Sequence, residues 1–197
     1  MSGIASIFSI LLTSLVLENA VFSRALDAST LLGPSFGRRG SWYFCGILTG
    51  VTTLSAAVAC LLSGLIGKLP AVQYLRPVAY LLILVLLYGL TCLILFWKQR
   101  SWLDNNLSML NMTFFNTAAY GAVVLSVYSS LNGWQGAVYG FGVGASYLLA
   151  VLILEQGRKA LAVCDLPKSF RGIAADLVYV GIIALALYGL VGHQLAA

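Results

Sequence analysis

Long apolar runs dominate this chain and limit the folds that are open to it. A transmembrane helix needs roughly 20 mostly apolar residues, and none of the runs shows the period-two alternation of a membrane β-strand. The 197-residue sequence is 60% hydrophobic and only 9% charged, which excludes an ordinary soluble domain. Six runs qualify as helical spans: residues 4–22, 42–66, 72–97, 107–128, 134–154 and 173–191. The sequence therefore predicts an all-α polytopic membrane protein with six transmembrane helices.

Polar residues interrupt the first and the fourth of these runs. Glu18 and Asn19 lie near the end of the first run, and Asn116 and Thr117 lie inside the fourth. A polar group in hydrocarbon costs several kcal/mol unless a partner satisfies it, so these residues need a structural or functional reason. Because three spans fill each half of the chain, any repeat between the halves has to be inverted across the membrane.

The sequence thus predicts one transmembrane domain over residues 1–197, built from inverted three-helix repeats at about 1–98 and 105–197. The interrupted first and fourth helices would then form a site between the halves. Residues 23–39 are too polar for a span and too apolar for a plain loop. Two alternatives follow for this segment: it re-enters the membrane, or it lies along the membrane surface.

Basic residues gather on one side of the predicted spans. Of the eleven Lys and Arg residues, only Lys68 and Arg76 fall on the other side. The remaining nine are Arg24, Arg38, Arg39, Lys98, Arg100, Arg158, Lys159, Lys168 and Arg171. This bias predicts that the first, third and fifth loops are cytoplasmic and that both termini are outside. The net charge of +5 is then a topology signal, and nucleic-acid binding need not be invoked. The first run lacks a preceding basic segment, so we expect a retained span rather than a cleaved signal peptide.

Two acidic residues fall within predicted spans and are candidates for function. They are Glu18 and Asp176. The alternative is that both simply lie near the membrane interface, with Arg24 or Arg171 as counter-charges. The remaining acidic residues border basic residues in the predicted cytoplasmic loops, and we expect them to be solvated: Asp27, Asp104, Glu155 and Asp165.

Glycines spaced four apart predict close helix packing. Gly136, Gly140 and Gly144 share one face of the fifth predicted span, and Gly46 and Gly50 do so in the second. A face without side chains lets another helix backbone approach closely. No strand precedes these glycines, so a phosphate-binding loop is excluded.

The cysteines and the single histidine form no metal-binding or catalytic motif. Cys45 and Cys60 are about 22 Å apart along one predicted helix, so they share neither a disulfide nor a metal. Cys92 lies in the third span and Cys164 in a cytoplasmic loop. We expect all four to be packing residues. His193 is next to the end of the chain and is expected to be solvated.

Several segments resemble one known family. Residues 161–172 (LAVCDLPKSFRG) look like the turn before the last helix of Rnf/Nqr-type membrane subunits, and residues 181–189 resemble the final span of that family. Residues 18–23 (ENAVFS) and 116–121 (NTAAYG) are similar to its two half-helix motifs. The glycine segment around Gly140 agrees as well. The resemblance covers essentially the whole chain.

The resemblance implies a subunit of an ion-translocating electron-transport complex in a prokaryotic inner membrane. In that family two homologous subunits of opposite topology pair and hold an iron–sulfur cluster, with one cysteine from each half-helix motif. Flavin-bearing subunits complete the electron path. This chain has Ser29 and Thr117 at the positions of those cysteines. Since iron–sulfur clusters are held by Cys and occasionally His, we expect no cofactor on this chain alone, with iron–sulfur and flavin groups in partner subunits.

Three functions remain open from the sequence. The first is an integral, non-catalytic subunit of an Rnf/Nqr-like complex, with Glu18, Asn19, Asn116 and Thr117 in an ion pathway or half-helix site. For the polar residues the alternative is hydrogen bonding that stabilises the bundle. The second function is a small secondary transporter or substrate-binding membrane subunit without a redox role. The third is a purely structural assembly factor.

Overall fold

The regular structure of this chain is helical in every part that the computed structural model describes, namely residues 3–27, 30, 37–66, 72–165, 167 and 170–191. The first half contains α1 (Gly3–Leu12), the π-helix η1 (Thr13–Leu17), α3 (Gly37–Ile66) and α4 (Val72–Lys98). The second half contains α5 (Arg100–Phe114), α6 (Thr117–Tyr128), α7 (Gly133–Val163) and α8 (Ile173–Val191). No strand occurs among the described residues, and the predicted all-α class is confirmed.

Three helices are long and apolar enough to cross a membrane, at Gly40–Gly64 in α3, Leu75–Lys98 in α4 and Gly133–Val163 in α7. The pair α5 and α6 passes the same test together and is bent by 47°, which gives up to four spans. Two shorter apolar helices lie at Ala5–Leu17 and Ile173–Gly189. The chain is therefore a polytopic membrane protein, whereas six full crossings in two inverted repeats stay a prediction.

The interruptions predicted for the first and fourth apolar runs are confirmed by the helix boundaries. The first run was expected to be helical to residue 22, but its helix ends at Leu17. Residues 18–24 form turns instead. In the fourth run, α5 ends at Phe114 and α6 begins at Thr117. Both halves of the chain thus have non-helical backbone next to an apolar helix.

The glycines of α7 bring this helix against α3. A side chain at Gly140 would collide with the backbone of Thr52, and one at Gly144 would collide with Thr49. Gly136 faces the backbone oxygen of Ala56 in the same way. This packing gives α3 and α7 the most extensive helix–helix contact in the described chain. The close approach predicted for this face of α7 is confirmed.

The matching prediction for α3 is wrong. Nothing lies within 4 Å of a side-chain carbon built at Gly46 or Gly50. These two glycines face away from the neighbouring helices because α7 packs on the other side of α3, around Thr49 and Thr52. The residue spacing alone did not identify which glycine face has a partner.

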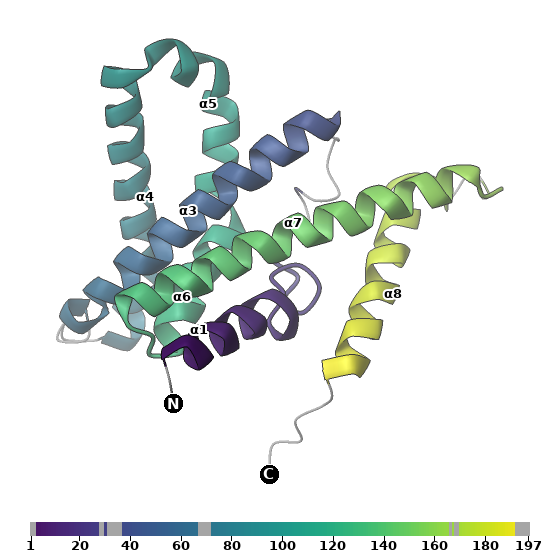
Figure 1. Cartoon of the computed structure of the whole chain (residues 1–197). Helices are drawn as coiled ribbons and strands as arrows, with labels where there is room; N and C mark the ends of the chain where they lie inside the picture. Colours follow the sequence, from purple (N-terminus) through teal and green to yellow (C-terminus); the bar gives the residue numbers. More distant parts are fainter. Residues whose placement is uncertain are drawn as a thin grey trace.

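Each half of the chain packs against the central helix of the other half. Figure 1 shows α3 and α7 crossing the middle of the molecule, with the start of α1 and the end of α8 at the lower side and the α4–α5 connection at the upper side. α1 and η1 pack on α7, while α6 packs on α3. The first segment of each half therefore lies against the second helix of the other half, which brings the two interruptions to the centre of the bundle.

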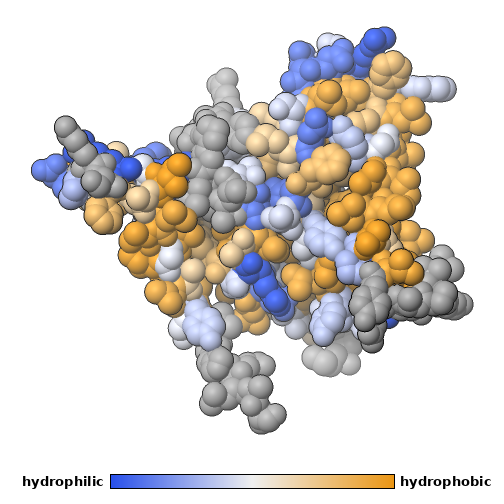
Figure 2. All heavy atoms as spheres, turned by 180° about the vertical axis from the view of Figure 1, so that it is seen from behind, coloured by the Kyte–Doolittle hydropathy of each residue, from blue (hydrophilic) through white to orange (hydrophobic). Residues whose placement is uncertain are grey.

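Large apolar side chains cover the outer helices. Figure 2 shows hydrophobic residues over much of one face of the molecule. Over its most apolar window α4 is 22% buried, against 50% for α7. Leu81, Leu86 and Leu90 of α4 and Ile182 and Leu185 of α8 are exposed. Such faces are suited to lipid or to other membrane helices.

Candidate functional site

The first interruption is organised by the side chain of Asn19. Its Oδ1 accepts hydrogen bonds from the backbone N–H groups of Val21 and Phe22, both at 3.0 Å. Its Nδ2 donates to the Leu15 carbonyl at 3.2 Å. The residue is only 4% exposed. Asn19 thus satisfies backbone groups that the end of the helix leaves without helical partners.

The second interruption has a similar device at the start of α6. Asn116 has an extended backbone and caps the helix, because its side chain accepts from the Ala118 N–H at 2.7 Å. Asn116 is 4% exposed. The amide oxygen is therefore used for the cap, which leaves the amide N–H groups to bind other partners.

The two interruptions meet at Asp27. Asn116 Nδ2 donates to Asp27 Oδ2 at 2.5 Å, and the Asp27 N–H donates to Thr117 Oγ1 at 2.8 Å. The Tyr147 side chain of α7 also interacts with the Asp27 carboxylate. Asp27 has a left-handed backbone, with φ 57°, and is only 6% exposed. We call Asp27, Asn116, Thr117 and Tyr147 the central polar cluster.

The position of Asp27 corrects the sequence analysis, which expected this residue to be solvated. Neighbouring Arg24 in the sequence suggested a cytoplasmic loop, but the turn that follows Asn19 directs residue 27 back towards α6. The Leu26 N–H donates to the Ala20 carbonyl at 2.8 Å within this turn. The structure describes residues 23–27, 30 and 37–39 of the segment 23–39, and both alternatives for it, membrane re-entry and a surface position, stay predictions.

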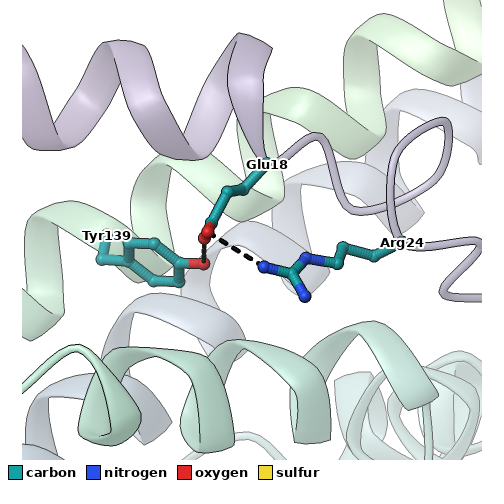
Figure 3. Close-up of polar contacts among 3 residues, drawn as sticks. All are labelled: Glu18, Arg24 and Tyr139. Carbon is teal, nitrogen blue, oxygen red and sulfur yellow. Dashed lines mark hydrogen bonds and ion pairs between the residues drawn. The ribbon is translucent and has the colours of Figure 1, made fainter. Parts of the chain in front are cut away.

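Glu18 lies at a separate polar contact on the other side of the first interruption. Figure 3 shows its carboxylate between Tyr139 of α7 and Arg24. The Tyr139 hydroxyl donates to Oε2 at 2.7 Å, and Arg24 Nη2 lies 2.9 Å from Oε1. The Glu18 side chain is 30% exposed and that of Arg24 is 44% exposed. The expected pairing with Arg24 is confirmed, and Tyr139 is a partner that the sequence did not reveal.

Asp176 holds α8 to α7 rather than extending the central polar cluster. Its Oδ2 accepts from Arg158 Nε at 2.7 Å, and the residue is 7% exposed. The sequence had suggested Arg171 as the counter-charge, which is wrong. Arg171 instead lies 3.5 Å from the exposed Asp165. One turn of α8 separates Asp176 from the chain reversal, and Arg158 reaches it because the last part of α7 contacts α8, where Gly157 lies against the Tyr179 ring.

The metal-binding side chains of the described residues are dispersed. No group of three or more His, Cys, Asp or Glu side chains comes together within the described part of the chain. Cys45 and Cys60 are buried in α3, Cys92 is in α4, and Cys164 is exposed after α7. At the second half-helix motif the Thr117 hydroxyl already accepts from Asp27. Ser29 and His193 lie outside the described residues.

Three functional candidates were missed by the sequence analysis: Asp27, Tyr139 and Tyr147. The two tyrosines were detectable in principle, because residues eight apart share one helix face and a polar tip on a buried face needs a partner. Both are at most 2% exposed. Nothing in the local sequence distinguishes Asp27 from a solvated loop residue, since its partners are 89 and 90 positions away.

Comparison with known proteins gives a consistent result across the chain. The family described as "Rnf-Nqr subunit, membrane protein" matches residues 7–193. A protein of Aeromonas salmonicida that is named as one of the subunits of an ion-translocating oxidoreductase complex is 28% identical over 185 residues, which cover 93% of this chain and 95% of the relative. The proteins of the same name from Yersinia pseudotuberculosis and Yersinia enterocolitica are each 32% identical over 145 residues, or 73% of this chain and 75% of theirs.

Proposed function

This chain belongs to the Rnf-Nqr subunit family of membrane proteins, and from that membership we propose that it is an integral subunit of an ion-translocating electron-transport complex. The observation that carries the proposal is the match of nearly the whole chain to proteins named as subunits of an ion-translocating oxidoreductase complex. The chain would supply a membrane bundle and part of an ion route, without catalysing a reaction by itself.

Polar groups at the interruptions support an ion route. Asn116 and Thr117 line a cavity of about 240 Å³ between the break and α4. Glu18 is partly exposed and paired with Arg24. Asn19 contributes indirectly, because its amide is committed to the backbone of its own turn. Half-helix ends with such side chains are the usual form of ion sites in transport proteins.

The complex would bring the redox cofactors through other subunits. Thr117 is not a thiolate ligand, and its hydroxyl is engaged by Asp27. We therefore assign iron–sulfur and flavin groups to partner subunits, one of them a homologous membrane subunit of opposite topology. The exposed faces of α4 and α8 offer apolar surface for such a partner or for the lipid bilayer.

The location follows from the charge bias. Nine of the eleven basic residues fall in the first, third and fifth loops of the expected topology. In a prokaryotic inner membrane this bias supports a topology with those loops in the cytoplasm and both termini outside. We expect protease added to intact spheroplasts to cleave a tag at either end of the chain. Protection of both tags would indicate the opposite orientation.

Purification of the tagged chain in mild detergent tests the proposal. Membranes from the native organism are solubilised, and the bound proteins, flavin and iron are identified in the eluate. Co-purifying flavin- and iron–sulfur-bearing subunits are expected. A homo-oligomer without redox subunits, under conditions that keep a known respiratory complex intact, would overturn the assignment.

Transport by the same preparation tests the ion route. Asn116→Leu removes the amide that caps α6 and binds Asp27. We expect loss of ion transport in a complex that still assembles. Asn105→Leu is the matched control, since Asn105 is an exposed residue of α5. Equal transport by both variants would assign Asn116 to the scaffold alone.

A second function is favoured by one observation, namely a threonine at the second half-helix motif. Threonine does not supply the thiolate that an iron–sulfur cluster needs at this position. Non-helical backbone in an apolar bundle and polar groups at the break are features of a small secondary transporter, which works without redox partners. In reconstituted vesicles this alternative predicts transport by the purified chain alone. Dependence of transport on an electron donor would exclude it.

A further inference from the structure

Asp27 is a buried carboxylate whose described partners are neutral. Its oxygens receive a hydrogen bond from the Asn116 amide and interact with the Tyr147 side chain. A buried carboxylate is costly in an apolar bundle, and proteins usually pair it with a cation. None of the ion pairs in the described part of the chain includes Asp27.

The contrast with Asp176 is informative because both residues are equally inaccessible. Asp27 is 6% exposed and Asp176 is 7% exposed. Asp176 has the guanidinium of Arg158 at 2.7 Å. Asp27 is held instead at the start of α6, where the helix dipole and the hydrogen bond from Asn116 Nδ2 stabilise a negative charge. Among the described residues, this environment stabilises the carboxylate without a fixed positive charge that would exclude a mobile cation.

Two cavities lie close to this region. The cavity of about 240 Å³ reaches Asn116 and Thr117, the two residues that hold Asp27. A larger cavity of about 970 Å³ lies between the ends of α3 and α6 and the start of α4. Tyr120 lies in the wall of both cavities. Asp27 itself lines neither cavity, and Arg76 lies in the wall of the larger one.

We propose that Asp27 binds an exchangeable monovalent cation, either a proton or Na⁺, at the junction of the two interruptions. The proposal rests on the proposed role in ion translocation and names the charged ligand for it. In the cation-free state the Asn116 amide and the α6 N-terminus stabilise the carboxylate. In the occupied state the cation neutralises it. A site that is stable in both states can take up and release its ion.

The described titratable side chains that face Asp27 carry no charge close to neutral pH. Tyr147 approaches Asp27 from α7, and Cys45 of α3 lies near the Tyr147 side chain. A phenol and a thiol are ordinarily neutral at pH 7. From α6 the site receives only the amide of Asn116 and the hydroxyl of Thr117. The binding of a cation is therefore governed by Asp27.

Modification by dicyclohexylcarbodiimide tests the proposal on the unaltered protein. This apolar reagent reacts with protonated carboxyl groups inside membranes. Trypsin cleavage after Arg24 and Arg38 isolates residues 25–38, in which Asp27 is the only acidic residue. The peptide that begins at Gly172 has Asp176 as its only acidic side chain up to residue 197, and modification localised to that side chain by fragmentation serves as the internal control. Mass spectrometry of the detergent-solubilised native preparation compares the two peptides between pH 5.5 and 8.5, in NaCl and in KCl of equal ionic strength.

We expect selective modification of residues 25–38 that increases as the pH falls. If the cation is Na⁺, NaCl at ten times the dissociation constant slows this modification about tenfold relative to KCl, because only the unoccupied site reacts. If the cation is a proton alone, the pH dependence is present and the two salts give equal rates. Modification of Asp27 no greater than that of Asp176 at every pH would overturn the proposal.

A variant pair extends the test to transport. Asp27→Asn removes the charge and is expected to abolish ion movement, whereas Asp104→Asn changes an exposed residue of α5 and is expected to retain it. The carbodiimide reaction is measured on peptides of this chain and does not depend on which proteins co-purify with it. Failure of the labelling would therefore contradict the Asp27 site without contradicting membership in the complex. Absence of redox subunits would contradict that membership without changing the labelling result.

Discussion

The Tyr139 hydroxyl donates a 2.7 Å hydrogen bond to Glu18 Oε2 and thereby joins α7 of one half to the interrupted first segment of the other. Arg24 binds the second carboxylate oxygen of Glu18 at 2.9 Å (Figure 3). Arg24, from the same segment, thus neutralises the Glu18 carboxylate, and Tyr139 of α7 positions it. Glu18 and Asp27 lie at opposite ends of the same turn region, and each contacts a different tyrosine of α7.

Tyr139→Phe should weaken the attachment of the first segment. Hydrogen bonds between helices of membrane proteins are modest, so we expect a loss of about 0.5–1.5 kcal/mol in the free energy of unfolding. Unfolding in mixed micelles measures the change, and a cycle with Glu18→Gln isolates the shared contribution. Additive effects of the two substitutions would mean that the 2.7 Å contact contributes nothing to stability.

The glycine face of α7 gives a prediction with a built-in control. Gly140→Ala would place a methyl group against the Thr52 backbone, which cannot yield without moving a helix. We expect a loss of about 1–3 kcal/mol from overpacking. Gly50→Ala meets nothing within 4 Å and should not reduce the stability of the isolated chain. The same unfolding assay compares them; equal losses would contradict the α3–α7 packing.

Gly50→Ala also reports on assembly. If a partner helix uses the vacant face of α3, this variant should be stable by itself but recovered with fewer associated subunits. Quantitative mass spectrometry of the purified complex provides the measurement. Unchanged recovery would assign that face to lipid.

Arg158→Ala should detach α8 more strongly than Arg171→Ala does. Asp176 is nearly buried, so removal of Arg158 leaves an uncompensated carboxylate, and a loss of about 1–3 kcal/mol is expected for this partly exposed pair. The pair of Arg171 with Asp165 is exposed and should contribute less than about 1 kcal/mol. Limited proteolysis of the α7–α8 connection measures the release. Equal sensitivity of the two variants would contradict the ranking.

Thr117→Val and Thr117→Ser separate the hydroxyl from the shape of the side chain. The valine variant leaves the Asp27 N–H without its acceptor, which should cost about 1–3 kcal/mol. The serine variant keeps the oxygen and should stay near the parent protein. Thermal unfolding in detergent checks the order. A valine variant as stable as the serine variant would show that the contact is dispensable.

Part of this architecture was predictable from local sequence. Apolar runs predicted the membrane fold, and the amides of Asn19 and Asn116 predicted the two interruptions, because a polar side chain that binds nearby backbone disrupts helical hydrogen bonding. The spacing of the glycines in α7 predicted close packing for the same local reason. The pairing of Glu18 with Arg24 was also accessible, since the two residues are six positions apart.

The sequence by itself determined the helical class and the two regions where apolar helices are interrupted, because those depend on neighbours along the chain. Only the tertiary structure decided which separated groups meet. It buried Asp27 against Asn116, matched Asp176 with Arg158 instead of Arg171, and left Gly46 without a neighbour. Hydrophobic periodicity fixes which elements enter the membrane, but the packing of α7 on α3 sets which polar groups come within hydrogen-bonding distance.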